Sequence, residues 1–500
     1  MRPLEITLGL ILLLTFLLLI SNDIFKRHRC TEGITAISLI CIILGTHIIF
    51  EGYRWQMIPM YTLSVIFIFL IIVRLLKIHT LRQRWFKIIG IVICSCLLLI
   101  AFTLPAILPV FTLPSPSGPY KIGTLTYRWN DSGRKDMLST EGGNREVLAQ
   151  IWYPSDKVSG SPESYIDNGY EFSKGAAHVV NTSGTMSFKM PDWALSHFQY
   201  IKTHAYQGTS VSEKKDKYPV LIYLSGMGGY RQSGMFQIEN LVSHGYIVVS
   251  IDQPHIAAIT TLSNGATVKS ISRPQIQPLI DQSSKQQNPT PILNSKEMPE
   301  GIIPYLSEDV SYVIDKIINI NTNDPKKVLT QKINTSKIGV FGISLGAIVA
   351  AEACHDENRI GACLMMDAQM PRAAYTDGLT QPSMWITRPA SDMRLERKES
   401  GGWTEEDIAL TQSTMIDTFK KSKNADSFFV NINGMFHVNF TDAGYYTPIS
   451  SLIGLTGPIN TKDGYNAINT YTLKFFDKSL LNKNENPCDN TPSATSCKSK

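Results

Sequence analysis

Four long apolar runs occupy the first 111 residues of the chain. Each approaches or exceeds the ~20 residues that a helix needs to cross about 30 Å of hydrocarbon. No small-x-small cleavage motif follows the first run, and three further runs do follow it, so we expect a four-helix membrane anchor over residues 1–111. The alternative is a cleaved leader in place of the first helix. The runs are roughly Ile6–Ile20, Ile34–Phe50, Ile58–Val73 and Ile88–Phe111.

The charges between these runs predict an orientation. The second connection, Glu51–Met57, has Arg54 as its one basic residue. The first and third connections are strongly basic, and basic connections stay in the cytoplasm. We therefore expect an integral membrane protein whose termini, second connection and whole chain after Phe111 are extracytoplasmic. The basic residues are Lys26, Arg27 and Arg29 in the first connection and Arg74, Lys77, Arg82, Arg84 and Lys87 in the third.

The pattern changes after a proline-rich linker at residues 112–119. Short apolar strands alternate with helical stripes such as Ser307–Ile320. This alternation is typical of a mostly parallel sheet with helices on both faces, so we predict an α/β domain over residues 120–482. Inserts are expected near 155–216 and 256–300, the second as a lid or a surface loop. The polar tail 483–500 is expected to be disordered. The strands are expected at Tyr120–Tyr127, Glu146–Trp152, Pro219–Leu224, Tyr246–Ile251, Ile338–Phe341, Ala362–Met366, Ser383–Ile386 and Ser427–Ile432.

Composition and charge mainly exclude classes of partner and cofactor. The net charge of +5 comes partly from the basic connections, and no Lys/Arg stripe lies beside aromatic residues in the later part, so we expect no nucleic-acid partner. No Cys-x-x-Cys pair or His/Cys cluster has zinc spacing, so we expect no metal and no cofactor. Cys488 and Cys497 could form a disulfide in an oxidising compartment. The oligomeric state is not indicated.

One pentapeptide carries candidate chemistry. Gly342-Ile343-Ser344-Leu345-Gly346 lies between an apolar strand and an apolar helix, which is the setting of a nucleophile elbow. The turn brings strand and helix backbones close together, so Gly342 and Gly346 are needed where side chains would not fit. The serine is then exposed above the sheet. The plainer alternative is a glycine-rich turn with a solvated serine.

A serine nucleophile needs a base and an orienting acid, in the chain order serine, acid, histidine. His355 and His437 follow Ser344, but His355 lies at the far end of the elbow helix, so His437 is the better base. Asp367 ends a predicted strand, where ligands collect in such sheets. Asp392, in the loop after the next strand, is its rival, and chain order alone leaves the choice nearly even.

The candidate oxyanion hole needs two backbone N–H groups. Leu345, the residue after the nucleophile, supplies one. The glycine-rich turn Ser225–Gly229 follows the first long parallel strand, so Met227 is the expected second donor. The alternative is a plain flexible turn.

Roughly residues 116–480 resemble the plasma-type platelet-activating-factor acetylhydrolase family. The resemblance implies an α/β-hydrolase fold and calcium-independent hydrolysis of short or oxidised acyl esters. In that family the acid follows the serine by about two dozen residues, which favours Asp367 because 367 − 344 = 23. The matching segments are Gly118-Pro119-Tyr120 with Gly123, Ser243–Val248, the elbow, the Asp367 segment and His437-x-Asn439-Phe440.

Two departures limit what the resemblance implies. The family has His-Gly where this chain has Ser225-Gly226, and Gly-His-Ser where it has Gly342-Ile343-Ser344, so acyl preference is not transferable. We expect hydrolysis of short-acyl or lipid-like carboxylic esters through an acyl-enzyme. The alternatives are acyl transfer by the same triad and a catalytically dead binding scaffold. A transporter is disfavoured, because the apolar runs hold hardly any ionisable residue.

Overall fold

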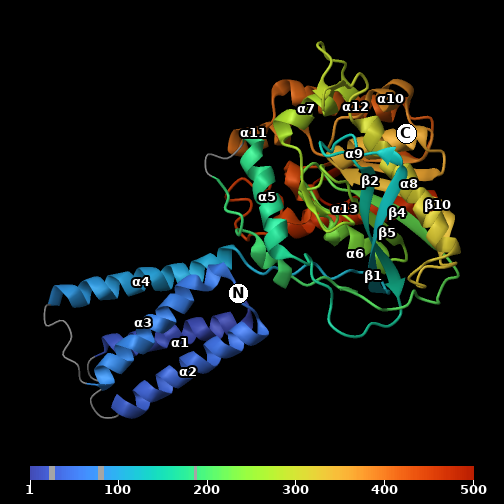
Figure 1. The fold of residues 1–500 in the computed structure, drawn as a ribbon. Helices are drawn as coiled ribbons and strands as arrows, with labels where there is room; N and C mark the ends of the chain where they lie inside the picture. The colour runs from blue at the N-terminus through green and yellow to red at the C-terminus, as the bar shows by residue number, and fades with distance from the viewer. Residues whose placement is uncertain (22–28, 77–83, 185–188) are drawn as a thin grey trace. The chain divides into compact units, whose positions relative to one another are not determined.

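The computed structural model describes residues 1–21, 29–76, 84–184 and 189–500 (Figure 1). The chain divides into two compact units. The helix unit contains Met1–Phe111 together with the short segments His197–Ile201 and Tyr446–Ile449, and the sheet unit contains the rest. Of the basic residues used to predict the orientation, Lys26, Arg27, Lys77 and Arg82 lie outside the described residues, as do the side chains of Arg29 and Arg84.

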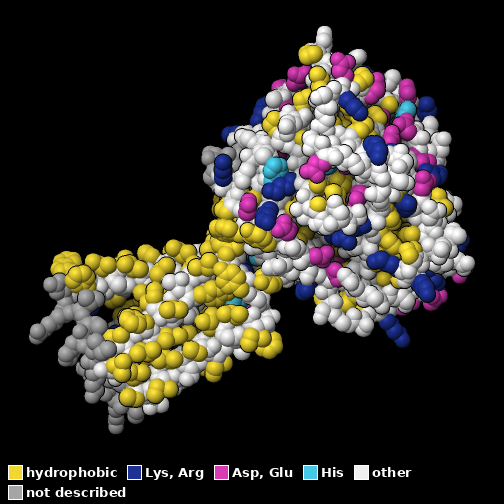
Figure 2. Space-filling view, viewed as in Figure 1, with side chains coloured by type: hydrophobic (Ala, Val, Ile, Leu, Met, Phe, Trp, Pro, Cys, Tyr) yellow, Lys and Arg dark blue, Asp and Glu magenta, His cyan; other side chains and the backbone are white. Residues whose placement is uncertain are grey.

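Four helices of the helix unit are long and apolar enough to cross a membrane. Leucine, isoleucine, methionine and phenylalanine side chains pack between them, while many others face outward and cover the outer surface of the unit (Figure 2). α4 ends at Ile107, four residues before the expected end, because Leu108 precedes Pro109 and a residue before proline disfavours the helical conformation. The helices are α1 (Pro3–Ile20), α2 (Arg29–Phe50), α3 (Ile58–Leu75) and α4 (Arg84–Ile107), and a short 3₁₀ helix, η2 (Trp55–Met57), precedes α3.

A buried charged cluster joins the helix ends, which the sequence analysis did not expect. Arg54 donates two hydrogen bonds of 2.7 Å to Glu5, and Arg2 donates to the same carboxylate at 2.8 Å. His47 contacts Glu51 at 3.0 Å. A count of charges along the apolar runs does not reveal how residues at three helix ends pair. We call these five residues the anchor cluster.

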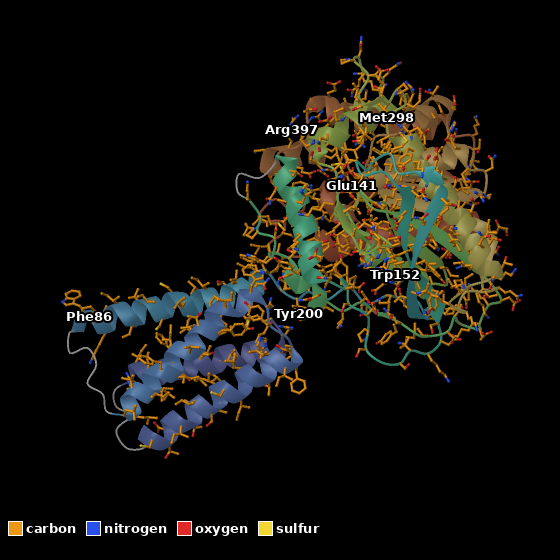
Figure 3. The ribbon with its side chains drawn as sticks, viewed as in Figure 1. Phe86, Glu141, Trp152, Tyr200, Met298 and Arg397 are labelled. Atoms are coloured by element: carbon orange, nitrogen blue, oxygen red, sulfur yellow. A yellow bond between two sulfur atoms is a disulfide. The ribbon has the colours of Figure 1, made fainter. Side chains whose placement is uncertain are left out.

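The two short segments bring aromatic side chains into the helix unit. Phe111 packs edge-on against Phe198 and stacks on Tyr446, with ring centroids 5.6 Å apart in both pairs. Tyr200, labelled in Figure 3, donates a hydrogen bond to the Tyr53 carbonyl at 2.7 Å. The helix unit is therefore completed by residues far along the chain, in η3 (Ser196–Tyr200) and just after η5 (Asp442–Tyr445).

A ten-stranded sheet forms the sheet unit, in the order β14-β13-β12-β11-β10-β4-β5-β2-β1-β3. The six strands from β5 to β13 run parallel, and β1, β2 and β14 pair antiparallel at the two sides. The expected strands are all present. They are β1 (Lys121–Lys135), β2 (Asn144–Ser155), β3 (Ala205–Tyr206), β4 (Tyr218–Leu224), β5 (Ile247–Asp252), β10 (Ile333–Ile343), β11 (Ile360–Met366), β12 (Ser383–Thr387), β13 (Ser427–Ile432) and β14 (Thr495–Ser499).

Helices cover both faces of this sheet. Central strands such as β4 are buried at every residue, so alternate side chains pack against helices on opposite faces. α8, α9 and α12 share one core with the sheet, and α6 and α13 pack on the other face. Trp152, labelled in Figure 3, is buried in β2. The helices are α5 (Gly169–Ser183), α6 (Met235–Ser243), α7 (Arg273–Ser284), α8 (Ile303–Thr322), α9 (Leu345–Asp356), α10 (Arg372–Asp377), α11 (Ala390–Ser400), α12 (Glu405–Lys421) and α13 (Thr461–Leu481).

The inserts and the tail carry some regular structure. The 155–216 insert contains α5, η3 and β3. The 256–300 insert contains α7 and two small hairpins, β6–β7 (Ile259–Thr261, Thr267–Lys269) and β8–β9 (Ile292–Leu293, Lys296–Glu297). The expected disorder of the tail 483–500 is wrong for its last residues, because β14 pairs with β13 through the backbone, which a polar composition does not prevent. The Cys488–Cys497 disulfide is present, and a second one, Cys354–Cys363, was not expected.

Candidate active site

The elbow is set by two glycines and one strained serine. β10 ends at Ile343 and α9 begins at Leu345, so Ser344 alone turns the chain, with φ 57° and ψ −127°. A Cβ on Gly342 would lie 2.4 Å from the Gly346 carbonyl oxygen, and one on Gly346 would lie 2.1 Å from that of Leu224. Only glycine fits at either position, as the sequence analysis expected, and strain of this kind clusters at functional sites.

The candidate acid and base meet at the same edge of the sheet. The Ser344 N–H donates to the Met366 carbonyl at 3.0 Å, so Asp367, at the end of β11, lies beside the elbow. His437 begins η4 (His437–Phe440), and its Nδ1 lies 2.7 Å from Asp367 Oδ2. Asp367 has a φ of +46°, which is the second strained backbone at this edge. The fold therefore places Asp367 next in sequence to the residue that bonds the Ser344 backbone and within hydrogen-bond distance of His437.

Strong donors surround the buried Asp367 carboxylate. Thr387 Oγ1 donates to its Oδ1 at 2.9 Å, and Arg388 Nε donates to its Oδ2 at 3.0 Å. Burial alone would raise the pKa of Asp367, but the Arg388 charge and the bonds from His437 and Thr387 hold that pKa well below its usual range. The carboxylate therefore stays ionised and can orient the imidazole and stabilise its protonated form.

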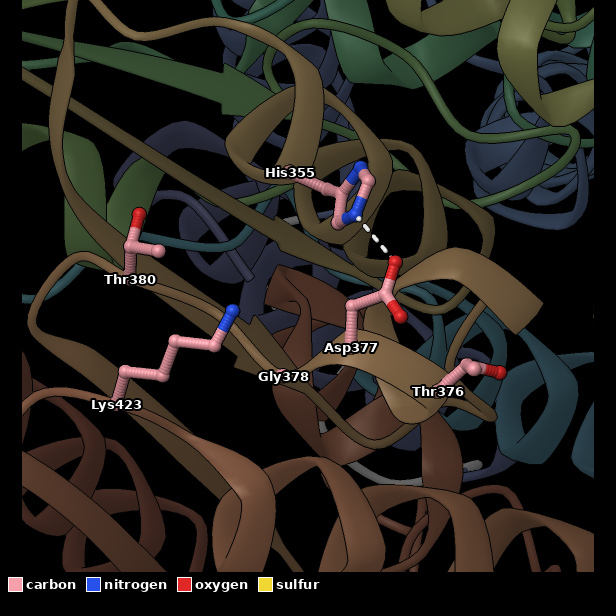
Figure 4. A pocket seen from close by; sticks show the side chains of 6 residues that line it. All are labelled: His355, Thr376, Asp377, Gly378, Thr380 and Lys423. Carbon is pink, nitrogen blue, oxygen red and sulfur yellow. Dashed lines mark hydrogen bonds and ion pairs between the residues drawn. The ribbon is translucent and has the colours of Figure 1, made fainter.

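The rival residues lie elsewhere. Asp392, the alternative acid, accepts a hydrogen bond from the Gly434 N–H at 2.6 Å in the turn before His437. His355, the alternative base, lines a polar cavity of about 420 Å³ with Asp377 and Lys423 (Figure 4). There it contacts Asp356 at 2.6 Å and Asp377 at 3.3 Å. This cavity contains none of Ser344, Asp367 and His437 in its lining.

The glycine turn after β4 lies against the serine. A Cβ on Gly226 would be 3.1 Å from Ser344 Cβ and 3.6 Å from its Oγ. The Gly228 N–H donates to Ile256 at 2.9 Å, and the Gly229 N–H donates to Gly226 at 2.9 Å, so the turn is held in place. The N–H groups of Met227 and Leu345 donate to no other described residue, which leaves both free for an oxyanion.

Several residues near the site escaped the sequence analysis. Arg388 and Thr387 bond Asp367, Glu396 accepts a hydrogen bond from the His437 N–H at 3.2 Å, and Trp403 packs edge-on against the His437 ring at 5.4 Å. Arg388 had a signal, because it directly follows β12, the neighbour of the strand that ends at Asp367. The same rule that selected Asp367 applies to it. Glu396 lies on α11 and Trp403 lies in the segment after this helix, and neither had a comparable signal.

The parallel sheet, with an elbow at the end of β10 and an acid and histidine from later strands, defines the α/β-hydrolase class. A solved ferulic acid esterase from Streptomyces cinnamoneus shares this fold with a TM-score of 0.58 and 19% identity, covering 78% of this chain and 99% of the esterase. The family model of platelet-activating factor acetylhydrolase, isoform II, matches residues 107–498. The chain belongs to this family and is a carboxylic ester hydrolase by class.

Curated relatives agree with this membership. A platelet-activating factor acetylhydrolase of Cavia porcellus is 22% identical over 379 residues, which is 75% of this chain and 79% of the relative. That of Canis lupus familiaris is 23% identical over 381 residues, covering 74% and 77%. The match begins near the end of α4, so the helix unit lies largely outside the region shared with the family.

Proposed function

We propose that the protein is a membrane-anchored serine esterase that hydrolyses short-acyl or lipid-like carboxylic esters through an acyl-enzyme. In this proposal Ser344 is the nucleophile, His437 is the general base and Asp367 is the orienting acid. The observation that carries the proposal is the 2.7 Å contact between His437 Nδ1 and Asp367 Oδ2, beside a serine on a nucleophile elbow. The family membership supports the same reaction class.

The first half of the reaction forms an ester on the enzyme. His437 takes the Ser344 hydroxyl proton while Oγ attacks the carbonyl carbon of the substrate. The carbonyl oxygen becomes an oxyanion and accepts hydrogen bonds from the Met227 and Leu345 N–H groups. The intermediate then collapses, the bond to the alcohol breaks, and the leaving alcohol takes the proton from His437.

Water completes the cycle. His437 removes a proton from a water molecule, whose oxygen attacks the acyl carbon, and the same two N–H groups bind the second oxyanion. Collapse returns the proton to Ser344 and releases the carboxylic acid. Asp367 stays ionised throughout, because its charge compensates the imidazolium in both halves.

The substrate class follows from the relatives and from the anchor. The curated relatives are platelet-activating factor acetylhydrolases, so a small acyl group on a lipid-like alcohol is the natural candidate. Ser225 and Ile343 stand where the family has histidine, so we leave the chain length to experiment. Four apolar helices would keep such an enzyme at a lipid surface.

We further propose that the sheet unit is extracytoplasmic. The second connection carries Arg54 as its one basic residue, and the other two connections are rich in lysine and arginine. Single cysteines placed at the exposed positions Tyr53 and Ser115 should be labelled from outside intact cells by a membrane-impermeant maleimide. The background lacks the four free cysteines, Cys30, Cys41, Cys94 and Cys96, and keeps both disulfides. Labelling only after permeabilisation would contradict the orientation.

Hydrolysis by the full-length protein in detergent tests the mechanism. p-Nitrophenyl esters of graded acyl length should be cleaved with EDTA present, since the proposed oxyanion donors are backbone N–H groups. Ser344→Ala should lose on the order of 10³-fold or more in kcat and should no longer react with a fluorophosphonate probe. His437→Ala should lose a similar factor. Full activity in Ser344→Ala would refute the serine mechanism.

A further inference from the structure

Arg388 is a buried cation in direct contact with the proposed triad. It follows β12, and its side chain is fully buried. Its Nε donates to Asp367 Oδ2 at 3.0 Å, and this oxygen is the same one that His437 Nδ1 contacts at 2.7 Å. The proposed reaction does not use Arg388, since its mechanism needs only the nucleophile, the base, the acid and the two N–H donors.

A second carboxylate links Arg388 to the backbone of the base. Arg388 Nη1 pairs with Glu396 Oε2, and the same Oε2 accepts the His437 N–H at 3.2 Å. His437 is thus held at its ring through Asp367 and at its backbone through Glu396, and the Arg388 guanidinium bridges the two carboxylates. We call Asp367, Arg388, Glu396 and His437 the site cluster.

Trp403 covers this bridge. The Arg388 guanidinium lies 5.0 Å from the Trp403 ring centroid, and the Trp403 and His437 rings pack edge to face with their centroids 5.4 Å apart. Arg388 Nη2 is also buried and has no hydrogen-bond partner among the described residues. A buried donor without a partner is unfavourable for folding, so stability alone does not account for arginine here.

The charges that face His437 can be counted. Asp367 and Glu396 supply two negative charges, and Arg388 supplies one positive charge. Asp392 bonds the Gly434 N–H in the preceding turn and adds a further carboxylate nearby. Arg388 therefore reduces the negative field at the imidazole without removing it. Without Arg388, two unpaired carboxylates would favour the imidazolium more strongly.

We propose that Arg388 is a positioning residue that fixes both carboxylates around His437 and, by its charge, lets His437 act as a base at lower pH. This inference rests on the proposed function. A purely structural ion pair would lower activity equally at every pH, whereas the proposed role also moves the acidic limb of the pH profile.

The test is the pH dependence of kcat/KM for p-nitrophenyl acetate with the full-length protein in detergent, because this profile reports the free enzyme. Arg388→Met removes the charge and both bonds. It should lower kcat/KM by about 10²-fold, as a misplaced catalytic group does. Its acidic limb should move up by about one pH unit, because the loss of the cation favours protonated His437.

Two further variants separate charge from geometry. Glu396→Gln keeps the size of the side chain but removes a negative charge, so its acidic limb should move to lower pH. Arg388→Lys keeps the charge but cannot bridge both carboxylates, so kcat/KM should fall while the limb stays near that of the wild type. If Arg388→Met does not fold, these two variants decide the question. Arg394→Met is the matched control, because Arg394 lies on α11 with Glu396 but forms an exposed ion pair with Glu405. This variant should leave the profile unchanged.

The outcomes are distinguishable. Opposite limb shifts in Arg388→Met and Glu396→Gln support the proposal. Folded Arg388→Met and Glu396→Gln proteins whose limbs both stay in place, whatever their activity, overturn it. If the wild type hydrolyses no ester, or if Ser344→Ala retains full activity, the proposed function itself fails. Ser344-dependent hydrolysis with unmoved limbs would leave that function standing and reject the role of Arg388 alone.

Discussion

Two of the clusters of buried charged residues in the molecule have different charge balances. The anchor cluster holds two carboxylates, two arginines and one histidine. The site cluster holds two carboxylates, one arginine and one histidine. In the anchor cluster the two negative charges of the carboxylates equal the two positive charges of the arginines, so the cluster is neutral when its histidine is neutral. In the site cluster one negative charge remains until the histidine is protonated.

This difference of one arginine separates a structural network from the network of the proposed active site. The two guanidinium groups bonded to Glu5 complete the anchor cluster, so a cation that joined Glu5, His47 and Glu51 would add uncompensated charge, although their ligand atoms lie within 4.8 Å of one another. In the proposed mechanism the site cluster instead becomes neutral when His437 holds the proton of Ser344. Buried charge therefore indicates chemistry only after all its partners are counted.

The largest effect is expected when the Asp367 charge is removed from the site cluster. Asp367→Asn should lower kcat by roughly 10²- to 10⁴-fold, because the imidazole loses both its orienting partner and its compensating charge. Asp392→Asn is the control and should be nearly silent, since an amide oxygen can still accept the Gly434 N–H. Steady-state hydrolysis of p-nitrophenyl acetate measures both. The reverse ranking would make Asp392 the acid.

The converse change unbalances the anchor cluster. Arg54→Met leaves Glu5 buried without its main partner, and breaking a buried pair of this kind costs about 3–5 kcal/mol. The helix unit should become sensitive to protease at lower SDS concentration, while esterase activity in detergent should stay within about twofold of the wild type.

A double variant tests whether charge is the cause. Glu5→Gln/Arg54→Met should recover part of the lost stability, because no unpaired charge is left behind. Loss of esterase activity in a folded Arg54→Met protein would contradict the separation of the two clusters. Equal damage in the single and double variants would show that packing, not charge, is responsible.

The sequence predicted the frame of the site well, for a physical reason. Parallel strands that are buried on both faces are continuous apolar runs, and the carboxyl ends of β10 and β11 were predicted to within two residues. The elbow glycines followed from local geometry. Asp367 and His437 were candidates because parallel strands bring their carboxyl ends to one edge, and the family spacing favoured Asp367 over Asp392.

The residues that contact Asp367 and His437, the second disulfide and the edge strand β14 could not be predicted in the same way. Arg388 reaches Asp367 across neighbouring strands, and Glu396 reaches the His437 backbone from α11, so both depend on long side chains rather than on a local pattern. The Cys354–Cys363 disulfide joins α9 to β11, whose ends meet only after folding. β14 is a polar edge strand that lacks the apolar signal of the others.

Glu352 sharpens the comparison, because it is a buried carboxyl that has no cation paired with it. It lies on α9, lines a cavity of about 250 Å³ with Glu300 and Arg372, and makes no hydrogen bond to a described residue. Burial, with the nearby Asp356 charge, raises the pKa of Glu352 from 4.5 to about 7. In contrast to Asp367, this carboxyl is protonated in the folded protein at mildly acidic pH.

The sign of its pH effect follows from this shift. Between pH 4.5 and 7 the unfolded chain releases the Glu352 proton and the folded protein keeps it, so stability falls as pH rises and is level above pH 7. Glu352→Gln removes the charge at nearly constant size. It should therefore stabilise the sheet unit by on the order of 1–3 kcal/mol at pH 8 and by nearly nothing at pH 4.

Thermal unfolding of the full-length protein in detergent, followed by tryptophan fluorescence at both pH values, measures this effect. Glu300→Gln is the matched control, since Glu300 lines the same cavity but is mostly exposed and paired with Arg372, so its loss should matter little at either pH. Esterase activity should be unchanged in both variants, because neither residue contacts the site cluster. An equal gain in stability at pH 4 and pH 8 would show that the substitution improves packing. The charge of the buried Glu352 carboxyl would then not destabilise this fold.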